Sequence, residues 1–167
     1  MHAQRQQDNR AFQVMREPGP GSLAVGYVLN RSEQATYSLD PVLQKRGIAA
    51  FAERKRWKFI RWYEEPEQRE QKVSAQHPVL AQLLSDARSQ FQVVLCSTYK
   101  CWTRGGRSAY VSLDLLRRLG VWWATADEQW DINTVWQEAI DMRKIFRYMR
   151  LVNRYLASLQ ADGKQEN

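Results

Sequence analysis

Four short apolar runs recur along this chain, with segments of helix length between them. The first run is continuous rather than alternating, which is typical of a strand buried on both faces of a parallel sheet. The runs are residues 23–29, 57–63, 91–96 and 121–125. Because strands that alternate with helices of about a dozen residues indicate an α/β domain, the sequence predicts a mostly parallel sheet of four to five strands flanked by helices.

Capping residues and prolines mark where the helices should begin and end. We expect Ser38 to cap a first helix that ends near Arg56. Pro78 stands at the start of a second amphipathic segment, because proline is favoured in the first turn of a helix. A third helix, residues 108–119, should stop before Gly120, a residue type that commonly closes helices.

Composition changes along the chain divide it into four parts. Residues 1–21 are polar and end in Pro-Gly-Pro-Gly, so we expect a flexible N-terminal tail. The α/β domain should cover residues 22–133, a long basic amphipathic helix residues 134–160, and a polar tail residues 161–167. A length of 167 residues is consistent with one domain and its extensions.

The charge balance favours a polyanionic partner such as nucleic acid. Lys and Arg number 25 and Asp and Glu number 18, which gives a formal charge of +7. The two cysteines, Cys96 and Cys101, and the two histidines are too few and too scattered for a zinc site, so no metal and no cofactor are expected. Neither a signal peptide nor a membrane span is predicted, so a cytoplasmic protein without a membrane partner is expected.

The C-terminal helix combines an apolar seam with a basic stripe. The apolar residues recur in steps of three and four, which is typical of a two-helix interface and predicts dimerisation. The seam consists of Met142, Ile145, Met149, Val152, Leu156 and Leu159. The stripe consists of Arg143, Arg147, Arg150 and Arg154. These arginines form either a solvated face or a surface for the DNA backbone, in which case binding would depend steeply on salt.

Several motifs, in order, resemble the catalytic domain of the serine recombinases, the resolvase and invertase family. The segment AVGYVLNRSEQATYSL is similar to the Y-x-R-x-S-T-x-x-Q…S-L opening of that family. The segment HPVLAQLLSDARSQFQVVLCSTYKCWTR is similar to its R-P-x-L-x-x-L-L…F-D-x-V-x-V-x-x-x-D-R-L-x-R block. The resemblance covers roughly residues 22–159. It implies a resolvase-like fold with a long C-terminal dimerisation helix.

The resemblance also implies a serine that attacks a DNA phosphate to form a phosphoserine link, with arginines that stabilise the transferring group. Counted without a gap from Tyr27, the first arginine of the family falls on Leu29 and its nucleophilic serine on Arg31. Its other site positions are also replaced, except for one acidic residue, Glu65. The replacements are Val42 for the helix glutamine, His77 for the arginine before Pro78, Tyr99 and Lys100 for an Asp-Arg pair, and Thr103 for the last arginine.

Three interpretations of function follow. The first is a catalytically inactive recombinase-like module that dimerises and binds DNA or an active recombinase. The second is an active strand-exchange enzyme in which a one-residue shift presents Ser32 as nucleophile, with Arg31, Lys100 and Arg104 around the phosphate. The third is a protein-interaction module without a nucleic-acid role. In the family a separate DNA-binding region follows the long helix, and the ending ADGKQEN leaves no room for one, so DNA contacts should be mostly to the backbone.

The tryptophans divide into core residues and one candidate for base stacking. Trp57, Trp62, Trp122 and Trp123 lie in or beside expected strands and should pack in the core. Trp102 follows the third strand in a loop, so it is the candidate for stacking on a base. Of the cysteines, we expect Cys96 to be a buried strand residue and Cys101 to be a loop thiol.

Overall fold

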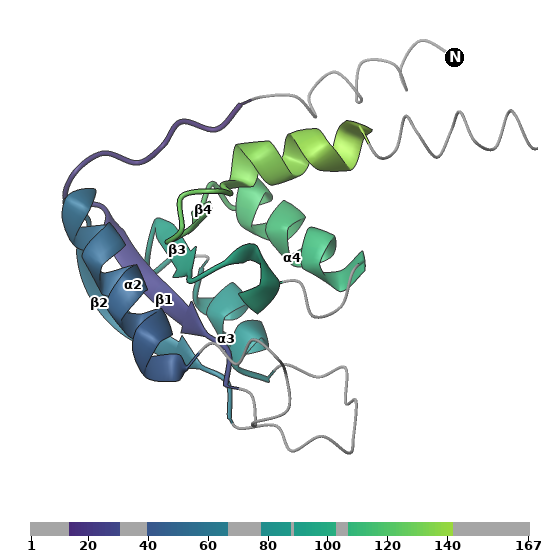
Figure 1. Ribbon diagram of the computed structural model, residues 1–167. Helices are drawn as coiled ribbons and strands as arrows, with labels where there is room; N and C mark the ends of the chain where they lie inside the picture. The colour runs from purple at the N-terminus through teal and green to yellow at the C-terminus, as the bar shows by residue number, and fades with distance from the viewer. Residues whose placement is uncertain (1–13, 31–39, 67–77, 88, 103–106, 142–167) are drawn as a thin grey trace, which may run out of the picture. The chain divides into compact units, whose positions relative to one another are not determined.

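A parallel four-stranded sheet organises the protein. The computed structural model describes residues 14–30, 40–66, 78–87, 89–102 and 107–141. The strands are β1 (Leu23–Val28), β2 (Lys58–Glu64), β3 (Val93–Cys96) and β4 (Trp122–Thr125). Their order across the sheet is β2-β1-β3-β4, and all neighbouring pairs are parallel (Figure 1). The predicted α/β class and mostly parallel sheet are therefore confirmed.

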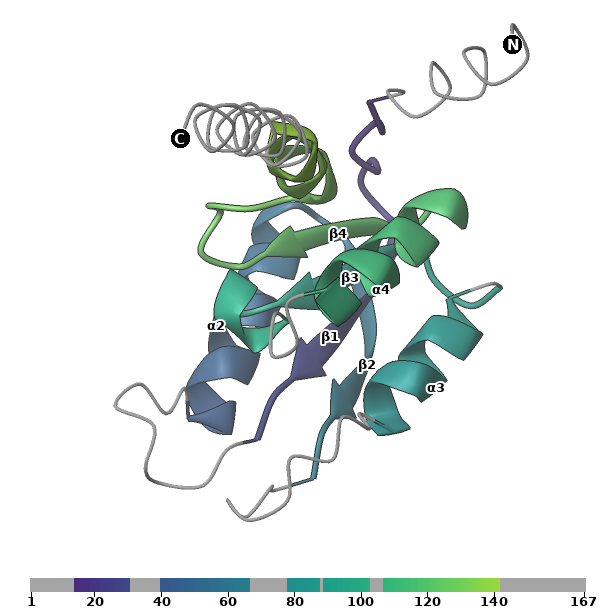
Figure 2. The same cartoon turned by 90° about the vertical axis from the view of Figure 1, so that its right-hand side faces the viewer.

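Helices cover both faces of this sheet. They are α2 (Pro41–Arg54), α3 (Pro78–Asp86) and α4 (Arg107–Arg118), with a short 3-10 helix η2 (Tyr99–Cys101) after β3. Figure 2 shows α2 on one face and α3 with α4 on the other. Residues 132–141 are also helical. None of the described helices is both long enough and apolar enough to cross a membrane.

The first helix begins later than the sequence predicts. Asp40 is its N-cap, since the Asp40 Oδ1 accepts a hydrogen bond from the Val42 N–H at 2.8 Å, and Pro41 is the first helical residue. The prediction of Ser38 as the cap is therefore wrong, and Ser38 itself lies outside the described residues. Aspartate before proline combines a strong capping side chain with a residue that lacks an N–H to satisfy.

The other predicted helix ends are closer to the structure. The second helix begins at Pro78, as predicted. The third ends before Gly120, which has a φ of +72° and whose N–H donates to the Arg117 carbonyl at 3.1 Å. The Val121 N–H donates to the Leu116 carbonyl at 2.9 Å, so both bonds of a Schellman motif are present.

Close packing between β1 and β2 depends on a glycine. A Cβ atom built on Gly26 would lie 2.6 Å from Cε3 of Trp62, on the neighbouring strand. Trp62 is partly exposed, whereas Trp57, Trp122 and Trp123 are buried as predicted. The largest fully buried side chain is Trp123, so the core extends to β4, an edge strand of the sheet.

Part of the predicted N-terminal tail is attached to the domain. The Met15 N–H donates to Asn133 Oδ1 and the Asn133 amide donates back to the Met15 carbonyl, both at 2.9 Å. The Trp57 indole N–H donates to the Pro18 carbonyl at 3.0 Å. These bonds place residues 14–21 against the domain rather than in a free tail, while residues 1–13 lie outside the described residues.

The chain divides into two compact units, residues 1–133 and 134–167. The predicted dimer seam and basic stripe, and the polar tail 161–167, all lie beyond residue 141, outside the described residues.

Candidate functional site at the carboxyl ends of the strands

Ligands of open parallel α/β sheets bind beyond the carboxyl ends of the strands. In this protein those ends are followed by residues 29–30 after β1, residues 65–66 after β2 and residues 97–102 after β3. The resemblance and the fold therefore indicate the same candidate site, at the edge of the sheet where Leu29, Glu65 and Trp102 lie.

The backbone that leaves β1 is held by one side chain from α2. The Leu29 N–H donates to Oε1 of Gln44 at 3.2 Å, and the Gln44 Nε2 donates to the Leu29 carbonyl at 2.7 Å. Gln44 is 1% exposed and Leu29 is 6% exposed. The position that the resemblance gives to the first arginine thus carries a buried aliphatic side chain on a fixed backbone.

A tyrosine and a glutamate link the ends of β1 and β2 to the start of α3. The Tyr27 hydroxyl donates to Oε1 of Glu65 at 3.1 Å, and the Leu80 N–H donates to the same oxygen at 3.0 Å. The Glu65 N–H donates to the Val28 carbonyl at 3.0 Å, and the Glu65 side chain is fully buried. This carboxylate therefore caps the first turn of α3 across the sheet. Burial and the neighbouring Glu65 raise the pKa of Tyr27 well above its ordinary value, so its hydroxyl stays a donor.

Two buried thiols lie at the end of β3 and in the η2 helix that follows it. The Cys96 Sγ donates to the Thr98 carbonyl at 3.4 Å, and the Thr98 Oγ1 lies 3.7 Å from the Cys101 Sγ. Burial raises the pKa of Cys96 well above its usual range, and Cys101 and Asp127 act in the same direction. Cys96 is the buried strand residue that the sequence predicts, whereas Cys101, expected as a loop thiol, is buried within η2. Because a thiolate is the nucleophilic form of cysteine, Cys96 is not suited to attack a substrate.

Trp102 is a core residue, so the prediction that it stacks on a base is wrong. Its side chain is 4% exposed and meets the Tyr27 ring edge-on, with 5.2 Å between the ring centroids. Its indole N–H donates to Oγ of Ser112, on α4, at 3.1 Å. Burial of so large an apolar ring stabilises the fold more than exposure in a loop would, provided that its N–H has a partner.

Of the other residues that align with the family's site positions, some are described by the structure and some are not. Lys100 is exposed on η2, and Tyr99 beside it stacks on Trp130 with 5.0 Å between ring centroids. Val42, at the position of the family's helix glutamine, is 62% exposed. The proposed nucleophile and several neighbours lie outside the described residues: Arg31, Ser32, His77, Thr103 and Arg104.

Gln44 is the residue of this edge that sequence reasoning missed. It shares the buried face of α2 with Ile48, Phe51 and Ala52. A glutamine in register with three apolar residues was the available signal, because a buried amide requires a specific hydrogen-bonding partner. The sequence could not show that this partner is Leu29.

No group of three or more His, Cys, Asp or Glu side chains arranged to hold a metal ion occurs among the described residues. At the end of β2, the carboxylate of Glu64 is paired with Lys45, whose Nζ lies 2.6 Å from Glu64 Oε2. This ion pair ties α2 to β2 beside the candidate site.

The fold is that of the serine recombinase catalytic domain. The N-terminal catalytic domain of TP901-1 integrase aligns with a TM-score of 0.58 and 14% identity, over 75% of this chain and 98% of that one. A resolvase family site-specific recombinase from Streptococcus pneumoniae aligns with a TM-score of 0.54 and 14% identity, over 82% and 99% of the two chains. The C-terminal catalytic domain of ISC1926 TnpA, an IS607-like serine recombinase, aligns with a TM-score of 0.51 and 22% identity, over 62% and 70%.

No family model and no curated protein matches the sequence. The predicted resemblance is thus confirmed by the structure neighbours, and at these identities what it establishes is the fold.

Proposed function

We propose that this chain is a serine-recombinase-fold module that does not carry out strand exchange and that acts by binding DNA or an active recombinase as a dimer. The observation that carries the proposal is the buried Leu29, held through both of its backbone groups by Gln44. Phosphoryl transfer depends on cations placed around the transferring group. An aliphatic side chain at this position gives no such stabilisation.

The neighbouring polar groups support the same conclusion. Glu65 accepts from Tyr27 and from the Leu80 N–H, so its carboxylate is used to hold β1, β2 and α3 together. Removal of one charge-stabilising donor typically costs about 10² to 10³ in rate. Replacement of several such positions would cost at least as much as the most damaging single replacement, and loss of the nucleophile removes the covalent route altogether.

The DNA partner and the dimer rest on charge and on the C-terminal helix. The chain carries +7, and the stripe of arginines at 143, 147, 150 and 154 would contact phosphates without reading bases. The seam of that helix would join two copies of this chain, or this chain and an active recombinase. The solved neighbours are an integrase, a TnpA recombinase and a resolvase family recombinase, which supports a role linked to DNA recombination. Free thiols at Cys96 and Cys101 are compatible with the reducing cytoplasm that we include in the proposal.

A cleavage assay tests the inactive site. The chain is incubated with a negatively supercoiled plasmid, and protein–DNA adducts are separated under denaturing conditions. We expect no adduct from the wild-type chain. An adduct that disappears in Ser32→Ala and persists in Ser89→Ala, a matched loss of one exposed hydroxyl, would overturn the proposal and establish the active enzyme with Ser32 as nucleophile.

Sedimentation with and without duplex DNA tests the binding role. We expect a dimer that binds duplex at low salt and releases it at high salt. Replacement of the four stripe arginines by glutamine should weaken binding and reduce its salt dependence. If the wild-type chain bound no duplex even at low salt, the third interpretation, a protein-interaction module, would be favoured.

A further inference from the structure

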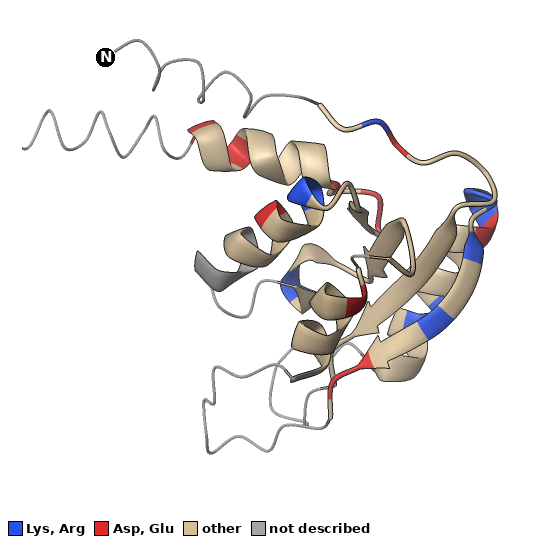
Figure 3. Ribbon diagram, turned by 180° about the vertical axis from the view of Figure 1, so that it is seen from behind, with Lys and Arg blue, Asp and Glu red and all other residues tan. Residues whose placement is uncertain are grey.

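The segment that runs from α2 through the α2–β2 turn into β2 is strongly basic. Residues 45–61 hold seven basic side chains and one acidic one, a net charge of +6, while the whole chain carries +7. Four of these cations, Arg54, Lys55, Arg56 and Lys58, lie within five residues, and we call them the turn cations. Figure 3 shows basic residues gathered over the end of α2 and along β2. Short runs of this kind are typical of surfaces that bind nucleic acid.

The backbone of this turn is tightly held. The Arg56 N–H donates to the Glu53 carbonyl and the Trp57 N–H to the Ala52 carbonyl, both at 2.9 Å, which forms a Schellman motif. The Arg56 carbonyl also accepts from the Gly21 N–H at 2.8 Å. The side chains of the turn are therefore presented from a backbone that needs no ordering when a ligand binds.

Arg56 occupies a position that favours glycine. Its φ is +56°, in the left-handed region, which is unfavourable for a residue with a Cβ atom. Glycine is the usual residue at this point of a Schellman motif, and Gly120 fills the equivalent point after α4. An arginine is less favourable than a glycine in this backbone conformation, but it presents an exposed guanidinium.

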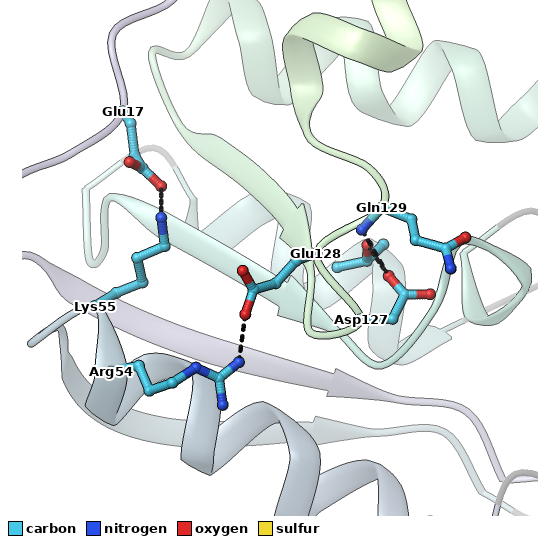
Figure 4. Close-up of polar contacts among 7 residues, drawn as sticks. Glu17, Arg54, Lys55, Asp127, Glu128 and Gln129 are labelled. Atoms are coloured by element: carbon cyan, nitrogen blue, oxygen red, sulfur yellow. Dashed lines mark hydrogen bonds and ion pairs between the residues drawn. The ribbon is translucent and has the colours of Figure 1, made fainter.

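Two of the turn cations are paired and two are open. Lys55 contacts Glu17 at 2.7 Å and Arg54 contacts Glu128 at 2.6 Å, as Figure 4 shows. Arg56 and Lys58 are exposed, and within the part of the chain that the structure describes neither side chain makes an ion pair or hydrogen bond. Exposed pairs such as Arg54 with Glu128 are weak, so these cations too are available to a stronger anion.

Structural roles explain only part of this cluster. Cations in the last turn of a helix interact favourably with its dipole, which accounts for Arg54. A lysine on an edge strand discourages pairing with another chain, which accounts for Lys58 on β2. Neither role needs an arginine in the left-handed position at residue 56.

We propose that Arg56 and Lys58 contact the phosphate backbone of duplex DNA, which makes the α2–β2 turn a second DNA-binding surface of this chain. Lys58 begins β2 and is in register with Leu23 at the start of β1, so the surface lies at the amino ends of these strands, away from the candidate site. The large apolar residues of the turn, Phe51 and Trp57, are buried at 3% and 5% exposure. A protein partner would use such aromatic anchors, whereas a phosphate backbone needs cations alone.

The inference rests on the proposed DNA partner and is tested on the full chain. Binding to a labelled random-sequence duplex is measured by anisotropy from about 50 to about 200 mM salt. The variants are Arg56→Gly, Lys58→Gln and the double change, with Arg118→Gln, a loss of one cation that is 72% exposed on α4, as the matched control. We expect the double variant to bind roughly tenfold more weakly and its salt slope to fall by about two, because each phosphate contact contributes about 0.9. Arg118→Gln should change neither quantity.

The outcomes separate this inference from the proposed function. Because Arg56→Gly suits the left-handed backbone, it should keep the wild-type thermal unfolding midpoint or raise it, so a loss of affinity in that variant reports binding. If the wild-type chain binds duplex and the double variant binds it with the same affinity and slope, the inference is wrong and the DNA partner stands. If the wild-type chain binds no duplex at low salt, both fail. Binding of labelled polyglutamate, an acidic peptide, is measured in the same way. If the variants lose this binding and keep their binding to duplex, the surface serves an acidic protein segment and the DNA assignment is overturned.

Discussion

The side chain of Gln44 forms the hydrogen bonds that a neighbouring strand would otherwise make with Leu29. Its Oε1 accepts from the Leu29 N–H at 3.2 Å and its Nε2 donates to the Leu29 carbonyl at 2.7 Å. Both residues are buried, so water cannot take over these bonds. The chain that continues toward residues 31–39 therefore leaves the sheet from a fixed point. This relationship accounts for how β1 ends.

Gln44→Leu should destabilise the protein by about 2 to 4 kcal/mol. The leucine preserves most of the volume but leaves the N–H and the carbonyl of Leu29 without partners, and each unsatisfied buried group costs about 1 to 3 kcal/mol. Urea unfolding followed by circular dichroism measures the change. Gln82→Leu, at an exposed position of α3, should change stability by less than about 0.5 kcal/mol. Equal stabilities for the two variants would show that the Gln44 bonds contribute nothing.

The sheet could be predicted from sequence because its signal is local. β1, β3 and β4 are apolar runs, and both Pro78 and Gly120 act through their own backbone preferences. The start of α2 was harder, since Ser38 and Asp40 are both good capping residues two positions apart. The proline that follows Asp40 decides between them, because it fits the first helical position.

The candidate site could not be predicted to the same degree because its interactions join distant parts of the chain. Gln44 and Leu29 are 15 residues apart, and Tyr27 and Glu65 are 38 residues apart. A periodic pattern shows which face of a helix is buried but not which group it meets. Trp102 illustrates the same limit, since its burial depends on η2 and on a hydroxyl of α4.

The bond between Tyr27 and Glu65 should make stability fall in alkali. The pKa of Tyr27 is raised by burial and by Glu65, so the folded state holds the phenolic proton more tightly than the unfolded state. Its contribution is complete below about pH 10, the unfolded value, and is lost as the pH rises further, at about 1.4 kcal/mol per pH unit. Urea unfolding between about pH 8 and pH 11 measures this decline.

Two variants assign the decline to its source. Tyr27→Phe should be less stable than the wild type at neutral pH by about 1.5 to 3 kcal/mol, because it removes a hydrogen bond to a carboxylate, and the difference should shrink above about pH 10. Tyr63→Phe should also reduce the decline, since burial and Asp86 raise the pKa of Tyr63 to about 12. A wild-type difference from Tyr27→Phe that stays constant across the range would contradict the assignment.

The thiol of Cys96 should be slow to react in the folded protein. Its pKa is raised by burial, with Cys101 and Asp127 adding to the effect, so little thiolate is present at about pH 8. Iodoacetamide labelling followed by mass spectrometry should modify Cys96 and Cys101 in denaturant and leave both unmodified under native conditions on the same timescale. Rapid native labelling at Cys96 would show that the β3 end opens to solvent.

The backbone at Arg56 should be strained by its side chain whatever the turn binds. A left-handed conformation costs a residue with a Cβ about 1 to 2 kcal/mol, and glycine avoids this cost at the expense of greater freedom when unfolded. Arg56→Gly should therefore be more stable than Arg56→Ala by about 1 kcal/mol, while both lose the same charge. Thermal unfolding of the two variants at one ionic strength measures the difference. If Arg56→Ala proved equal to or more stable than Arg56→Gly, residue 56 would not adopt the left-handed conformation in solution.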